Sequence, residues 1–187
     1  MGFFYKAKSS VINFFADIRF YWLGFVLFGN SSYQLKGDQM REILNAIKPG
    51  DILLRRYNHY LGSVLVPGHY SHAAIYIGDD RVIHMLGKGI TNEDILTFMR
   101  CDDVAIMRAL MPQKQIDAAI KKAKEYEKMG VEYDYNFDTN SPARFYCTEM
   151  TDGCYDYPVK EEIMPRKKIM PDDYTKSGFF EVVWYKG

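Results

Sequence analysis

Apolar side chains recur at helical spacing over residues 10–28, near the N-terminus. One face of the predicted helix carries Val11, Phe14, Phe15, Ile18, Trp22, Phe25 and Phe28, and Asn13, Asp17 and Gly24 fall on the other side. The uncharged run over residues 20–28 is too short for a bilayer span, which needs about 20 apolar residues. Three interpretations of this helix are open: it packs on the domain, it lies in a membrane interface, or it covers a partner surface. We expect an N-terminal helical extension over residues 1–37 and a main domain over residues 38–187.

The pattern changes after residue 50 to short apolar runs separated by turns, which are typical of strands. Strands are predicted over residues 51–56, 72–77, 81–86, 103–108 and 179–185. Helices are predicted from Asp38 to residue 47, over 91–99, from Pro112 to the Gly130 stop, and over 145–155. Because strands precede and follow a helical middle, the predicted class is α+β, with a mostly antiparallel sheet packed against helices.

The turn Gly78-Asp79-Asp80 predicts a hairpin between two of these strands. If the loop holds three residues, Ala74 lies opposite His84. His72 and His84 then share one face as diagonal neighbours, about 7–8 Å apart at the backbone. A loop one residue shorter or longer would place the two imidazoles on opposite faces.

Cys147 falls in the first turn of the predicted helix over residues 145–155. Free N–H groups at a helix start favour a thiolate and can hold an oxyanion. Cys154 lies two turns deeper, and Cys101 stands beside two aspartates that would raise its pKa. Cys147 is therefore the best candidate nucleophile, with one histidine as its base and the second to orient the first.

Two other interpretations of these residues stay open. A lone cysteine is usually a small buried hydrophobic residue, and a lone strand histidine is usually a satisfied polar residue of the core. Zinc could also be bound by a subset of His59, His69, His72, His84 and Cys147, although the chain has no C-x-x-C pair and no helix-type histidine spacing. We expect no metal and no cofactor.

Composition limits the classes of partner. Of the 187 residues, 48% are hydrophobic and 26% charged, which suits one globular domain. Lys plus Arg and Asp plus Glu are equal at 24 each, and this balance argues against nucleic acid as a partner. Three cysteines make no disulfide framework, and no cleavable signal peptide is predicted. We expect a cytoplasmic protein, with peripheral membrane contact through residues 10–28 as an alternative.

Four segments resemble the YiiX/YaeF family of permuted papain-like hydrolases, which belongs to the NlpC-type superfamily and is related to lecithin:retinol acyltransferase. They are GDILL (50–54), SHAAIYIGDDRVIH (71–84), YDYNF (133–137) and FYCTEM (145–150). The resemblance covers roughly residues 48 to 185 and implies a circularly permuted papain-like fold. It matches Cys147 to the nucleophile, His72 to the base and His84 to the third position, which is often acidic in the YiiX group and a histidine in the acyltransferases.

The resemblance implies acyl transfer through an acyl-enzyme. The expected reaction is hydrolysis of an amide in a peptidoglycan-type peptide or a lipidated substrate. A lipid acyltransferase or thioesterase on the same three residues and an inactive binding module are the alternatives. Asp51 and Asp134 are expected to fix loops around the cleft, and Glu149 to support the start of the helix. The aromatic N-terminal segment and the many Tyr and Phe residues favour an apolar or membrane-near substrate.

Overall fold

The computed structural model describes residues 18–20, 26–28, 33–58, 66–135, 137, 144–164 and 168–186. The chain divides into two compact units, Met1–Tyr33 and Gln34–Gly187; the sequence had placed the boundary after residue 37. In the first unit, strand β1 (Ile18–Phe20) pairs antiparallel with β2 (Val26–Phe28).

The prediction of a helix over residues 10–28 is therefore wrong at residues 18–20 and 26–28, which form strands. Isoleucine, valine and phenylalanine have high strand propensity, so their helical spacing over a short stretch does not decide the structure. The rest of that segment, including its predicted membrane contact, lies outside the described residues. Within the described part of the chain, no helix has the length and apolarity that crossing a membrane requires.

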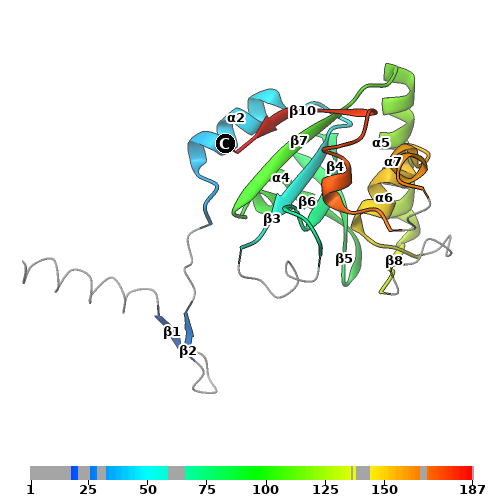
Figure 1. Cartoon of the computed structure of the whole chain (residues 1–187). Coiled ribbons are helices and arrows are strands. Elements are labelled where there is room, and N and C mark those ends of the chain that lie inside the picture. Colours follow the sequence, from blue (N-terminus) through cyan, green and yellow to red (C-terminus); the bar gives the residue numbers. More distant parts are fainter. Residues whose placement is uncertain are drawn as a thin grey trace, which may run out of the picture. The chain divides into compact units, whose positions relative to one another are not determined.

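The second unit is built on a six-stranded sheet whose order is β10-β7-β3-β4-β5-β6 (Figure 1). All neighbouring strands are antiparallel. The strands are β3 (Ile52–Arg56), β4 (His72–Gly78), β5 (Arg81–Leu86), β6 (Gly89–Asp94), β7 (Asp103–Ala109) and β10 (Phe180–Tyr185). The predicted α+β class and antiparallel sheet are confirmed.

The first half of the helix predicted over residues 91–99 is a strand. Residues 91–94 pair with β5 as part of β6, and only α4 (Ile95–Phe98) is helical. The side chain of Asp94 accepts hydrogen bonds from the N–H groups of Leu96 and Thr97. This cap begins the helix after Asp94 and leaves the preceding residues free to pair in the sheet.

Helices cover both faces of the sheet. On one face, α5 (Gln113–Met129), α6 (Cys147–Cys154) and α7 (Pro158–Glu162) share a core with the strand side chains Ile52, Leu54, Ile75, Ile83 and Met85. On the other face, α2 (Gly37–Ala46) and α4 share a core with Leu53, Ala74, Tyr76, Val82 and Ile106. The short pair β8 (Glu132–Tyr133) and β9 (Arg144–Phe145) is parallel and leads into α6, and the 3-10 helix η1 (Pro171–Asp173) precedes β10.

The hairpin β4–β5 has the predicted register, but its turn is shorter than predicted and β4 contains a bulge. Ala74 opposes His84 and Tyr76 opposes Val82, as expected. The turn, however, consists of two residues, Asp79 and Asp80, both with positive φ, and the register shifts between Tyr76 and Gly78. The bulge takes up the residue that the shorter turn removes, so the two histidines stay on one face.

The loop before β3 is fixed by contacts of Gly50 and Asp51. The carboxylate of Asp51 pairs with the Arg108 guanidinium at 2.7 Å and accepts the N–H of Lys48 at 2.8 Å. Gly50 has φ 98°, and a Cβ there would lie 2.2 Å from Cγ2 of Ile116. Asp51 therefore fixes this loop, and glycine is required beside it. The loop lies at the opposite end of β3 from Arg55, which lines the pocket, so it is not the loop around the cleft that the sequence predicted.

Candidate active site

Cys147 is the first residue of α6, after the extended N-cap Tyr146. The residue is only 9% exposed. Burial raises the pKa of the thiol above its usual value, and the N–H groups of Ala73, Thr148 and Cys147 itself offset this only in part. The sequence correctly placed the thiol in the first turn of a helix. The N–H groups at the helix start favour the thiolate, as expected, but desolvation is the larger effect and the pKa of the thiol is raised overall.

His72 and His84 contact each other directly. Nε2 of His72 lies 2.8 Å from Nδ1 of His84, and the two rings are steeply inclined at 75°. His84 is fully buried and its ring packs edge-on against Phe98. Burial, followed by the nearby Arg55 guanidinium, lowers the pKa of both imidazoles, to about 3 for His84. Both rings are therefore neutral at neutral pH.

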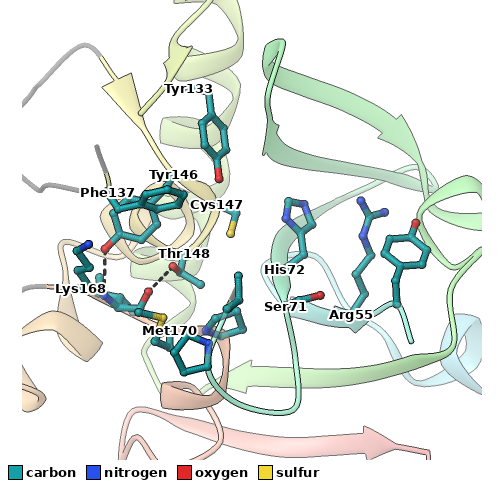
Figure 2. A pocket seen from close by; sticks show the side chains of 15 residues that line it. Arg55, Ser71, His72, Tyr133, Phe137, Tyr146, Cys147, Thr148, Lys168 and Met170 are labelled. Atoms are coloured by element: carbon teal, nitrogen blue, oxygen red, sulfur yellow. Dashed lines mark hydrogen bonds between the residues drawn. The ribbon is translucent and has the colours of Figure 1, made fainter. Parts of the chain in front are cut away.

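The third element of the site is the position of the thiol relative to this pair. Cys147 and His72 lie on facing walls of one pocket (Figure 2). Cys147 belongs to the core on one face of the sheet, and His72 shares the other face with Ala74; both line the pocket near the start of β4, before its pairing with β5 begins at Ala74. Since Nε2 of His72 is engaged by His84, Nδ1 is the nitrogen left for the thiol. Among the described residues no hydrogen bond joins the two, and such contacts are often long in unliganded sites.

The pocket has a volume of about 500 Å³ and mostly apolar walls. Apolar and aromatic lining comes from Tyr57, Val66, Pro67, Tyr133, Phe137, Tyr146, Ile169, Met170 and Pro171. One wall is tied to α6: Oγ1 of Thr148 donates to the Ile169 carbonyl at 2.7 Å, and the Ile169 N–H donates to the Tyr146 hydroxyl at 3.0 Å (Figure 2). The residues on either side of Cys147 thus hold the apolar wall in place.

Tyr133 and Arg55 also line the pocket, and sequence reasoning did not single them out. The hydroxyl of Tyr133 points toward Cys147 (Figure 2). Burial, and then proximity to Cys147, raise the pKa of Tyr133, so its O–H is an available donor. Arg55 lies opposite His72 on the neighbouring strand. Two features of the sequence could have indicated these residues. Arg55 places a charge in the otherwise apolar start of β3, and Tyr133 begins one of the four segments that resemble the family.

The other two cysteines and His69 are not among the residues that line this pocket. Cys101 and Cys154 are buried, and burial raises the pKa of each to about 12. His69 pairs with Asp103, with Nε2 and Oδ2 2.5 Å apart. His59 lies outside the described residues. The described part of the chain has no group of three or more His, Cys, Asp or Glu residues placed to hold a metal ion.

The two acidic residues beside the site are both buried. Asp134 is joined to the strand before α6, because its N–H donates to the carbonyl of Phe145 at 3.0 Å. Glu149 lies in the first turn of α6, where its charge suits the positive end of the helix. Neither side chain lines the pocket, so their places suit the supporting roles expected of them.

The model of a family described as permuted papain-like amidase enzyme, YaeF/YiiX, C92 family, matches residues 46–183. The chain belongs to this family. A crystal structure described as metalloprotein yiiX from Escherichia coli O157:H7 is similar at a TM-score of 0.58 and 15% identity. The match covers 75% of this chain and 98% of the other, and it shows a common fold. No curated protein matches the sequence.

Membership of this family supports a cysteine-type amide hydrolase in general. The YiiX-like permuted papain fold expected from the sequence is confirmed. The metal named for the Escherichia coli protein belongs to the description of that protein. The described residues of this chain include no cluster of side chains that would fit a metal ion.

Proposed function

We propose that the chain hydrolyses an amide whose acyl group is apolar, with Cys147 as nucleophile, His72 as general base and His84 as the orienting residue. The supporting observation is the apolar pocket of about 500 Å³, which has the thiol on one wall and the base on the other. Its size falls within the range of small-molecule sites, and its walls suit an acyl chain better than a polar peptide.

The proposed first step breaks the amide. Sγ of Cys147 attacks the carbonyl carbon while its proton passes to Nδ1 of His72. The N–H of Cys147 and the hydroxyl of Tyr133 are the proposed donors to the resulting oxyanion. Collapse expels the amine, which takes the proton from Nδ1, and leaves a thioester on Cys147.

The second step releases the acyl group. A water molecule gives a proton to Nδ1 of His72 and attacks the thioester carbonyl. As the acid leaves, the thiolate of Cys147 takes that proton from Nδ1. The same thioester could pass to another acceptor. Acyl transfer or thioester hydrolysis is therefore the second candidate, favoured by the apolar walls and by histidine at position 84.

A pair of chromogenic amides tests this proposal. Octanoyl p-nitroanilide carries an apolar acyl group, and a glycyl-serine p-nitroanilide carries a polar one. We expect release of nitroaniline from the first, at a kcat/KM at least about tenfold above the second, because burial of each CH₂ contributes about 0.8 kcal/mol. Cys147→Ser should abolish release and Cys154→Ser should not. Preference for the dipeptide, or unchanged rates in Cys147→Ser, would contradict the proposal.

A further inference from the structure

His84 has a second ring nitrogen that the proposed mechanism does not use. Its Nε2 is buried and forms no hydrogen bond within the described residues. The carboxylate of Glu93 faces it, with Oε2 at 3.5 Å, the outer limit of a hydrogen bond. In the β5–β6 pairing His84 opposes Thr91, so Glu93, two residues on, lies on the same face as a diagonal neighbour.

Glu93 is in turn faced by Arg55. Nη1 of Arg55 lies 3.7 Å from Oε2 of Glu93 and donates to the carbonyl of Phe98 at 3.3 Å. The guanidinium also stacks over the Phe98 ring, 4.3 Å from its centroid. The arginine is 7% exposed, so its stacking on Phe98 is shielded from water, whereas the side chain of Glu93 is 23% exposed. These contacts hold the charged partner of Glu93 in one place.

The four side chains come from four successive strands on one face of the sheet. Arg55 on β3 opposes His72 on β4, His72 bonds to His84 on β5, and His84 faces Glu93 on β6. The row begins with a cation and ends with an anion, with two neutral imidazoles between them. Each neutral imidazole carries one ring proton, on Nδ1 or on Nε2, and the hydrogen bond between the two rings couples these choices.

The proton positions follow from what each atom must do. His72 can take the thiol proton only if Nδ1 is bare, so its own proton must sit on Nε2. That N–H is donated to Nδ1 of His84, which must then carry its proton on Nε2. An ionised carboxylate accepts and never donates, so Glu93 suits this tautomer and opposes the reverse one. In the reverse arrangement His72 is protonated on Nδ1 and cannot act as a base.

We propose that Glu93 is a positioning residue that holds the proton of His84 on Nε2 and so leaves Nδ1 of His72 bare toward Cys147. The catalytic consequence rests on the function proposed above, whereas the tautomer itself does not. During the reaction, protons enter and leave the imidazole of His72 only at Nδ1. The protons on Nε2 of His72 and Nε2 of His84 stay in place. The imidazolium of His72 is stabilised by the acceptor Nδ1 of His84 and, beyond it, by the Glu93 carboxylate.

Nitrogen-15 NMR of histidine-labelled protein at neutral pH tests the tautomer without any substrate. The chain has four histidines, so the signals of positions 72 and 84 can be assigned by single substitutions. We expect the wild-type protein to carry the proton on Nε2 in both rings. A His84 ring protonated on Nδ1 overturns the proposal, whatever the enzyme hydrolyses.

The variant arm compares Glu93→Gln with Asp94→Asn. Both remove one carboxylate from β6, but Asp94 caps α4 and asparagine caps as well as aspartate. We expect Glu93→Gln to show both His84 tautomers and to lower kcat for octanoyl p-nitroanilide by about tenfold to a hundredfold with KM unchanged, the scale known for orienting residues. Asp94→Asn should change neither. Equal behaviour of the two variants overturns the proposal, and a wild type with the expected tautomer but no hydrolysis refutes only the proposed function.

Discussion

Nε2 of His72 and Nδ1 of His84 lie 2.8 Å apart because a bulge in β4 compensates for a two-residue turn. The contact uses one nitrogen of the base and leaves the other to face the thiol. Neither imidazole is positively charged at neutral pH, since burial and Arg55 lower the pKa of both. The resting site is thus a neutral thiol beside a neutral imidazole.

This resting state predicts the pH dependence of Cys147 alkylation. Burial keeps the pKa of the thiol above its usual value, and the pKa of His72 is lowered, so no thiolate–imidazolium pair forms on its own. The rate with iodoacetamide should rise from about pH 7 into the alkaline range. Mass mapping of alkylated peptides at each pH gives the rate. A fast rate that does not change between about pH 5 and pH 7 would mean a preformed ion pair and contradict this account.

Tyr133→Phe tests the second oxyanion donor. The hydroxyl points toward Cys147 and stays protonated, because burial raises its pKa. Removal of one such donor should lower kcat by about a hundredfold with little change in KM. Tyr135→Phe is the control, since the Tyr135 hydroxyl donates to the carbonyl of Gly87 and does not line the pocket. Equal kcat values for the two variants would remove Tyr133 from the mechanism.

Much of this site was predictable from local sequence, and the failures have physical causes. Strand pattern and turn residues placed His72 and His84 on one face, and a helix start placed Cys147. The meeting of thiol and base was not predictable locally, because the two come from opposite faces of the sheet. Glu93 was missed because residues 91–94 were assigned to a helix, and helical spacing hides its alternation with Thr91. The direction of the pKa shift of the thiol could not be predicted, because it depends on the burial of Cys147, which is known only from the tertiary structure.

The buried imidazoles also predict a pH dependence of stability. The folded-state pKa of His84, about 3, lies below the unfolded value of 6.5, so the unfolded chain binds more protons between these values. This contribution is fully present above about pH 6.5 and is lost as the pH falls toward 3, by up to about 1.4 kcal/mol per pH unit. Urea unfolding of wild type and His84→Leu at about pH 7.5 and 5 measures it. The wild type should lose more stability than the variant, and equal losses would contradict a depressed pKa.

Gly50→Ala tests the loop that precedes β3. The new methyl group would meet Cγ2 of Ile116 at 2.2 Å and would also occupy a left-handed conformation, with φ 98°. We expect the free energy of unfolding to fall by about 2 kcal/mol or more. Gly130→Ala is the matched control: its φ is 64°, but a Cβ there meets nothing within 4 Å. It should cost only the backbone strain, about 1 kcal/mol. Equal losses in denaturant unfolding would rule out the steric contact.

The central claim is that Cys147 carries the acyl group, and mass spectrometry of the trapped intermediate tests it most directly. The protein is mixed with the p-nitrophenyl ester of octanoic acid, quenched in acid within seconds and digested. We predict one octanoyl group, attached to the peptide that contains Cys147, in the wild type and in Cys154→Ser, and a much lower yield in His72→Ala. An unmodified Cys147, or equal acylation of Cys147 with and without His72, would contradict the account.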